Sequence, residues 1–200
     1  MYGLPAATEV RKALPKAAIY RRFQLTAAAK NAFDADVSSI EISHELSPQT
    51  LSVAADGTIR AIYVLTLQAK RRNFAPKSLQ LLSKLIDQTL LFAVQFEGKT
   101  CFGLFQDKLY LSPWQPETEA VLRLDGLTLD AIWTSFVKGI VGGEWNVELS
   151  LTENLTQIEE RQRIEQEIAR LEKLARKEKQ PRKKFELVER INLLKGEIQA

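Results

Sequence analysis

Cysteine, histidine and methionine each occur only once in this chain, at Cys101, His44 and Met1. A single thiol excludes an internal disulfide and a cysteine-rich metal cage, so we expect Cys101 to be a small buried side chain in a reducing compartment. No stretch approaches the roughly 18 consecutive apolar residues of a membrane-spanning helix. The N-terminus also lacks the basic-then-apolar order of a signal peptide, so we expect a cytoplasmic protein that does not bind a membrane.

Phosphate-binding loops are missing from the sequence as well. Neither the Gly-x-x-x-x-Gly-Lys pattern nor the Gly-x-Gly-x-x-Gly pattern occurs, so nucleotide binding has no support. His44 has no serine or cysteine motif beside it, and a hydrolase triad is therefore not indicated. We expect His44 to be a solvent-facing residue of a strand, and we expect no cofactor.

What the chain does contain is an ordinary globular composition. Of its 200 residues, 45% are hydrophobic and 26% are charged, with a net charge of +3, which is typical of a folded domain. This length suits one domain of ordinary size with an appendage. We predict an α+β domain over residues 1–143, with a mixed sheet, packing helices and an N-terminal arm. A C-terminal helical hairpin or coiled coil is predicted over residues 150–200.

The first sixty residues combine turn signals with short periodic segments. Thr26 is a suitable N-cap for an alanine-rich helix over residues 27–36, and residues 37–47 alternate as a strand does. Two further elements are predicted here, a short helix at Thr8-Glu9-Val10 that Pro15 stops, and a strand at Leu51–Ala54 that Asp56-Gly57 closes.

The densest apolar region runs from Ile59 to Leu111 and must supply the core. Ile59–Gln68 is apolar at positions that face both ways, which indicates a strand buried on both sides. A helix begins at Pro76, because proline is favoured in the first helical turn. Glu97-Gly98-Lys99 is typical of a tight turn between two strands. The other elements predicted from here onward are strands Leu90–Phe96, Thr100–Phe105, Leu109–Leu111 and Ala120–Leu124, and a helix Thr128–Ile140.

From about Leu151 charged residues dominate, with apolar ones at helical spacing. Pro181 interrupts this pattern, and a proline inside a helix costs on the order of 3 kcal/mol, so we predict two helices with a break at that point. They fold back as an antiparallel hairpin or, in the alternative, pair with another chain as a homodimer. Residues 144–151 stay open: they alternate like a strand, yet Ser150 and Glu153 fit a capping box.

Positive charge gathers in separate clusters along the sequence. One lies in the N-terminal arm, a second follows the strand Ile59–Gln68, and a third runs from Arg170 to Lys184. Such clusters neutralise phosphates without reading the base sequence, although lysine and arginine also simply solvate a helical surface. The residues that the sequence nominates as nucleic-acid contacts are Lys70, Arg71, Arg72, Lys77, Arg182, Lys183 and Lys184.

An enzyme hypothesis rests on Asp87, Glu97 and Lys99. Nucleases of the restriction-endonuclease type use an acid and a Glu-x-Lys motif, in which the carboxylates hold Mg²⁺ and the lysine orients or activates water. The glycine between Glu97 and Lys99 argues against this hypothesis, because it favours a turn with both side chains at an exposed tip. A Mg²⁺-dependent nuclease is therefore an alternative, and no metal site is expected without it.

A series of short motifs covers nearly the whole chain. They are Leu4-Pro5-Ala6-Ala7-Thr8-Glu9-Val10, Pro15-Lys16, Leu46-Ser47-Pro48, the segments 59–70, 90–99 and 127–140, and Lys177-Glu178-Lys179-Gln180-Pro181-Arg182-Lys183-Lys184-Phe185. In this order they resemble a bacterial family, domain-of-unknown-function family 4391. Similar proteins tend to be encoded beside helicases and DNA methyltransferases, in restriction or antiviral-defence settings. The resemblance implies a partner of that kind, and no catalytic residue is carried over.

We therefore predict a non-catalytic accessory subunit of a bacterial DNA-processing system. Its C-terminal helices and basic clusters would dock it on a helicase or DNA methyltransferase, or on the DNA that this partner handles. Two alternatives remain open, the Mg²⁺-dependent nuclease and a sequence-independent nucleic-acid-binding module.

Overall fold

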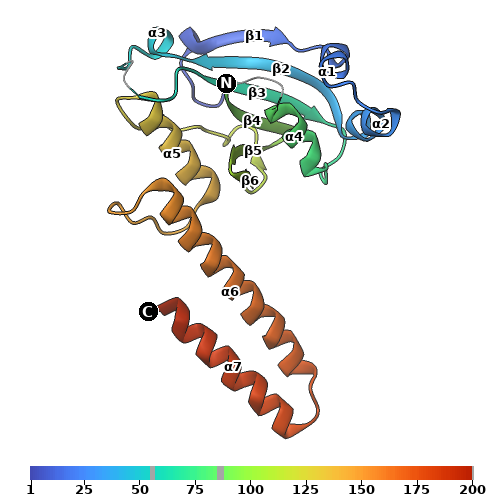
Figure 1. Cartoon of the computed structure of the whole chain (residues 1–200), viewed down its shortest axis with the longest axis vertical. Helices are drawn as coiled ribbons and strands as arrows, with labels where there is room; N and C mark the ends of the chain where they lie inside the picture. Colours follow the sequence, from blue (N-terminus) through green and yellow to red (C-terminus); the bar gives the residue numbers. More distant parts are fainter. Residues whose placement is uncertain (55–56, 85–87, 200) are drawn as a thin grey trace. The chain divides into compact units, whose positions relative to one another are not determined.

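Two structural units make up the part of the chain that the computed structural model describes, residues 1–54, 57–84 and 88–199 (Figure 1). The first unit, Met1–Gly142, holds a mixed sheet and its helices, and the second, Gly143–Ala200, holds two long helices. The α+β class predicted from the sequence is confirmed. Within the described ranges, no helix has both the length and the apolar character that crossing a bilayer requires.

The sheet of the first unit is organised around one parallel pair of strands. Its strand order is β1-β2-β3-β4-β5-β6, with β7 paired to β5; β3 and β4 run parallel, and the other described pairs are antiparallel. The strands are β1 (Glu9–Ala13), β2 (Val37–Leu46), β3 (Ile62–Ala69), β4 (Thr89–Phe96), β5 (Lys99–Gln106), β6 (Lys108–Leu111) and β7 (Gln115–Pro116).

Helices of the first unit cover the sheet and join its strands. They are η1 (Ala6–Thr8, a 3₁₀ turn), α1 (Lys16–Phe23), α2 (Ala27–Asp36), α3 (Pro48–Leu51), α4 (Pro76–Ser83) and α5 (Leu129–Val141). Side chains from α1, α2 and α4 pack with β2, β3 and β4 in one apolar cluster, which includes Ile19, Phe33, Leu65, Leu79, Leu82 and Phe92. The connection that carries α4 is the crossover that a parallel pair such as β3 and β4 requires.

Several elements form where the sequence predicts them. Thr26 caps α2 by accepting a hydrogen bond from Ala29 N, and Pro76 is the first residue of α4. The strands β4 and β5 meet at the predicted turn, in which Glu97 and Gly98 have φ angles of 46° and 70°. Positive φ at both central residues is the geometry of a tight hairpin turn, and glycine adopts it without strain.

The N-terminal arm differs from its prediction. Residues 9–13 form the edge strand β1, antiparallel to β2, so the helix expected at Thr8-Glu9-Val10 is wrong. Pro15 lies at the N-cap of α1 and therefore begins a helix rather than ending one. The reason is that the residue before a proline favours an extended backbone, which suits the end of a strand as well as a turn.

Two predicted strands are also wrong. At Leu51–Ala54, the capping box of Ser47 with Thr50 begins α3, so Leu51 is helical, and Asp56 lies outside the described residues. At Ala120–Leu124 no strand forms. That segment is held instead by contacts such as Leu122 N donating to Tyr2 O at 2.9 Å. In both segments a cap or a contact with a distant residue outweighs β propensity.

The second unit is a helical hairpin made of α6 (Leu151–Lys177) and α7 (Pro181–Gln199), which lie antiparallel in Figure 1. The predicted break at Pro181 is confirmed, and Ser150 with Glu153 forms the capping box that was one of the two possibilities left open for residues 144–151. A small apolar core joins the two helices, formed by Ile168, Leu171, Ala175, Ile191 and Leu194. Residues 144–150 form no strand, although their alternation allowed one, and residues 147–148 form a turn.

Candidate nucleic-acid interface

Four exposed cations project from the segment that joins β3 to α4 and from the first turn of α4: Lys70, Arg71, Arg72 and Lys77. Asp36, the last residue of α2, is only 1% exposed and holds this segment in place. Its carboxylate accepts hydrogen bonds from Arg71 Nε at 2.6 Å, from Ala75 N at 2.9 Å and from Ser78 Oγ at 2.8 Å. The basic turn, as we call residues 70–77, is therefore fixed at both ends.

The charge of Asp36 is stabilised by these donors. Burial alone would raise the pKa of the carboxyl, but the hydrogen bonds from Ala75, Ser78 and Arg71 outweigh burial and lower it below its usual range. Because the guanidinium of Arg71 is committed to Asp36, we assign Arg71 to anchoring the turn. Lys70, Arg72 and Lys77 are left to present charge to solvent.

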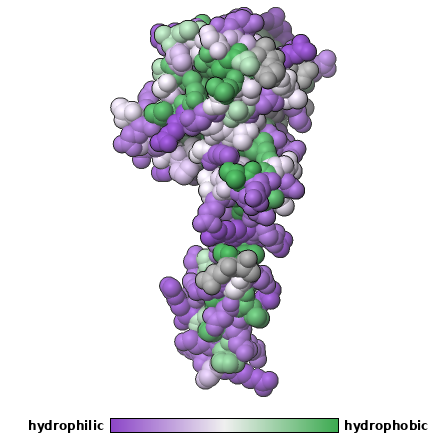
Figure 2. Space-filling view, turned by 90° about the vertical axis from the view of Figure 1, so that its left-hand side faces the viewer, coloured by the Kyte–Doolittle hydropathy of each residue, from purple (hydrophilic) through white to green (hydrophobic). Residues whose placement is uncertain are grey.

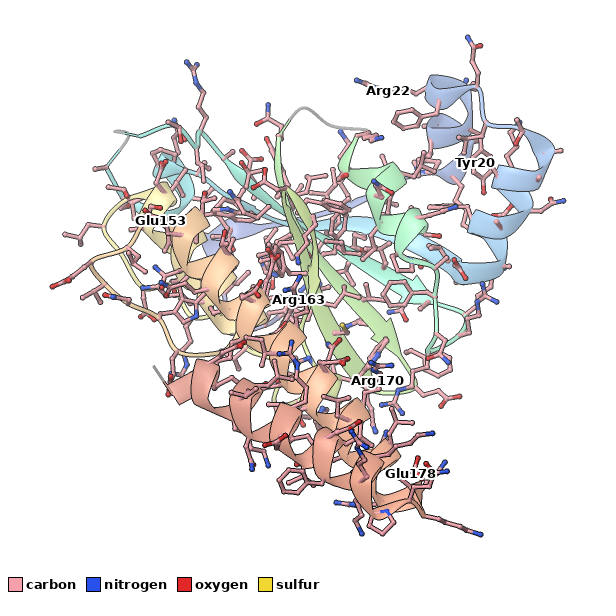
Figure 3. All side chains as sticks on the ribbon, turned by 60° about the horizontal axis from the view of Figure 1, so that its bottom comes forward. Tyr20, Arg22, Glu153, Arg163, Arg170 and Glu178 are labelled. Carbon is pink, nitrogen blue, oxygen red and sulfur yellow. The ribbon has the colours of Figure 1, made fainter. Side chains whose placement is uncertain are left out.

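The N-terminal basic cluster is also partly structural. Lys16 Nζ donates to Asp34 Oδ1 at 2.7 Å and to the carbonyl oxygen of Val37 at 2.5 Å. Tyr20, labelled in Figure 3, donates to the same Asp34 oxygen at 2.6 Å. Burial and the neighbouring carboxylate together raise the pKa of Tyr20 to about 12. Lys16 therefore ties α1 to α2.

The second unit carries the other nominated cations, at the end where α6 turns into α7. We call residues 176–186 the hairpin tip; six lysine and arginine residues lie there against two glutamates. Figure 3 shows nitrogen-tipped side chains projecting around Glu178 at this end. Arg182, Lys183 and Lys184 are all exposed and stand in the first turn of α7.

Charge is distributed differently along the rest of the hairpin, which we call the shaft (residues 151–175 and 187–199), where most cations are in ion pairs. Arg163 bonds Glu160 at 3.0 Å, Arg170 bonds Glu167 at 2.8 Å, and Lys195 bonds Glu172 at 2.9 Å. Within the described part of the chain, the ion pair at the tip is Arg182 with Glu186 at 3.5 Å, and none reaches Lys177, Lys179, Lys183 or Lys184. The tip thus keeps an excess of positive charge that the shaft does not have.

The position of these cations opposes the dipole of α7. A helix N-terminus carries partial positive charge, and the first turn of α7 contains no acidic residue. An acidic residue in this turn would stabilise the helix by about 0.3–1 kcal/mol, and a cation in the same place forgoes that stabilisation. A bound anion would relieve this repulsion, whereas helix stability alone would favour aspartate or glutamate at the same positions.

One aromatic residue at the tip is exposed. Phe185 follows Lys184 directly and is 64% exposed, and Val188, one turn further on, is 41% exposed. The small core of the hairpin uses Leu187, Ile191 and Leu194 instead. Figure 2 shows apolar patches interrupting the hydrophilic surface toward this end of the hairpin. The signal in the sequence is that Phe185 lies half a helical turn away from the Leu187–Ile191–Leu194 stripe.

The residues of the nuclease hypothesis do not form a site in the part of the chain that is described. Glu97 and Lys99 are exposed on either side of Gly98, at the turn between β4 and β5. Asp87 lies outside the described residues. Across residues 1–54, 57–84 and 88–199, no three histidine, cysteine or acidic side chains are grouped as a metal site would require.

Two residues with reactive side chains lie in the interior of the first unit. His44 is 1% exposed, so the expectation that it faces solvent is wrong. Its Nδ1 lies 2.9 Å from Thr8 Oγ1, and because the Thr8 hydroxyl donates to Pro5 O, the ring nitrogen is the donor. Cys101 is buried as expected, and burial raises the pKa of its thiol to about 11. Both side chains serve the packing of the fold.

The fold and these side chains therefore define an α+β protein with two exposed basic surfaces, one on each unit. A family model described as "Domain of unknown function (DUF4391)" matches residues 2–198. The chain belongs to this family, as its motifs indicated. No curated protein matches the sequence, and no solved structure matches the fold.

Proposed function

We propose that this protein is a non-catalytic accessory subunit of a bacterial DNA-processing system, and that it contacts nucleic acid through the hairpin tip and the basic turn. The observation that carries the proposal is the charge distribution of the hairpin. Most cations of the shaft are in ion pairs, whereas the tip keeps an excess of cations at a helix N-terminus. Unpaired cations at a helix N-terminus do not stabilise the helix, so binding of a polyanion explains them better than a purely structural role does.

The basic turn supports the same role on the first unit. Because Asp36 anchors Arg71, the neighbouring Lys70 and Arg72 are carried on a fixed backbone. A fixed cation loses less conformational freedom when it meets a phosphate than a cation on a mobile loop. Contacts of this kind position a protein on nucleic acid without specifying a sequence.

The cellular setting that we propose is the cytoplasm, beside a helicase or DNA methyltransferase of a restriction or antiviral-defence system. The support for it is the resemblance noted in the sequence, because similar proteins tend to be encoded beside such enzymes. An accessory subunit fits the exposed Glu97 and Lys99 better than an enzyme does, because a catalytic pair is normally held in a concave, partly buried site. If a helicase or DNA methyltransferase is encoded beside this chain, co-expression with it should yield a complex; failure of such a partner to co-purify with the full chain would contradict the accessory role.

Nucleic-acid contact is tested by removing three positive charges from the tip in one variant and three from the shaft in another. The variant R182Q/K183Q/K184Q removes three cations at the tip, and the control R161Q/R163Q/R170Q removes three ion-paired cations from the shaft. We expect the tip variant alone to reduce the slope of log affinity against log salt by about 2 to 3. Equal slopes for the tip variant and the unmodified protein, measured by fluorescence anisotropy, would contradict the proposal.

A further inference from the structure

Phe185 occupies a position that the hairpin itself does not need. Its side chain is 64% exposed, while the apolar contacts between α6 and α7 are made by other residues of α7. An exposed phenylalanine adds nothing to the stability of the fold, whereas burying such a side chain contributes about 1.5–3 kcal/mol. A ligand that covers the ring would recover this contribution.

The neighbours of Phe185 are cations. Arg182 lies three residues before it on α7, and residues at this spacing share a face of a helix. Lys183 and Lys184 precede it directly, and all three cations are exposed. An aromatic ring is thus presented together with positive charges that remain available for phosphates.

This combination discriminates between kinds of nucleic acid. In a duplex the faces of the bases are stacked inside, so a protein surface of this kind reaches the phosphate backbone alone. In a single strand the base faces are accessible, and stacking on an aromatic side chain contributes irrespective of sequence. Cations follow the backbone while the ring takes a base, which is the arrangement used by proteins that bind single strands.

We propose that the hairpin tip binds single-stranded nucleic acid, with Phe185 as the group on which a base stacks and Arg182, Lys183 and Lys184 as its phosphate contacts. The inference rests on the proposed function, because it names the substrate class of that same surface. A protein partner is the less favoured occupant. A protein surface laid over Phe185 would have to desolvate the surrounding cations, and burying unpaired charge is costly.

The stacking role of the Phe185 ring is tested with three substitutions at this position in the full chain. Binding is measured by anisotropy with labelled oligodeoxythymidine and oligouridine of about 16 nucleotides and with a DNA duplex of equal length. We expect F185A to weaken single-strand binding about 10-fold and to leave duplex binding unchanged. F185W should retain single-strand affinity, whereas F185L, which is apolar but cannot stack, should behave as F185A does.

The control is L193A, which removes another exposed apolar side chain of α7, itself 62% exposed. It should leave every affinity unchanged. The two oligonucleotides distinguish DNA from RNA, and preferred binding of either one supports the proposal. Wild-type binding that is equal for single strand and duplex, or an F185L variant that binds as the unmodified protein does, would overturn it.

Failure of this inference can be separated from failure of the proposed function. If R182Q/K183Q/K184Q loses binding while F185A does not, the tip contacts phosphates without stacking, and the inference alone fails. If the triple variant binds as tightly as the unmodified protein, both fail. A single-strand preference that requires both Phe185 and the cations supports both.

Discussion

Asp36 is the residue on which the basic turn depends. It accepts hydrogen bonds from a side-chain cation, a backbone N–H and a hydroxyl, all supplied by residues 71–78. A buried carboxylate with this many donors stabilises its loop strongly, because removing it leaves the donors without an acceptor. The geometry of the turn is therefore set from outside its own sequence.

Replacing Asp36 by alanine should cost about 3 kcal/mol of unfolding free energy in the first unit, since Ala75 N–H and Ser78 Oγ lose a buried acceptor. Urea denaturation followed by tryptophan fluorescence measures the loss. D34A is the control, because Asp34 is more exposed and bonds Lys16 and Tyr20 rather than the turn. A D36A midpoint equal to that of D34A would contradict the anchoring role.

At the scale of elements, the start of α6 is organised by one amide side chain. Asn154 Oδ1 accepts from Asn146 N at 2.7 Å, and its Nδ2 donates to the carbonyl oxygens of Asn146, Leu149 and Ser150 at 2.9 to 3.0 Å. These bonds hold residues 146–150 as a turn leading into the helix. They explain why the alternating apolar residues of this segment do not form a strand.

Substituting Asn154 by alanine should destabilise this turn and the first helical turn of α6 by about 2 kcal/mol, because several backbone groups lose their partner together. Amide hydrogen exchange measures the change as faster exchange of Asn146 and the residues that follow. T156A is a matched control on the same helix, where the lost bond from Thr156 to Thr152 O is a local one. Unchanged protection of Asn146 in N154A would show that other contacts hold the turn.

For the molecule as a whole, acid should act in two stages. Burial lowers the pKa of His44 below its ordinary value of 6.5, helped by the nearby N-terminal ammonium group. The unfolded chain therefore binds a proton before the folded chain does, so stability falls as pH drops below about 6.5. The pKa values of Asp34, Asp36 and Asp130 are also lowered, so a second loss begins below about 3.9.

Replacing His44 tests whether this residue causes the first loss of stability. H44N removes the titrating ring but keeps a side-chain N–H to direct at Thr8 Oγ1. Its unfolding free energy, measured by urea titration at several pH values, should not change between about pH 7 and pH 5, even if it is lower throughout. A pH slope in H44N equal to that of the unmodified protein would assign the first stage to another group.

The sequence by itself determined the features that neighbouring residues control. Thr26 and Ser150 place helix starts because their side chains bond N–H groups three residues away. Gly98 sets the turn between β4 and β5, and Pro181 separates α6 from α7. The cations of the basic turn and of the hairpin tip are likewise visible as runs, since charge is a property of the residue alone.

Only the tertiary structure decided what each exposed or buried group does. Residues 9–13 became a strand because β2 offered an edge, and His44 became buried among residues that precede it by more than thirty positions. Arg71 was distinguished from Arg72 by Asp36, which lies 35 residues away. Phe185 was left outside because the helical phase of α7 is set by its contacts with α6. Local patterns specify local hydrogen bonds, whereas burial and pairing depend on which distant elements meet.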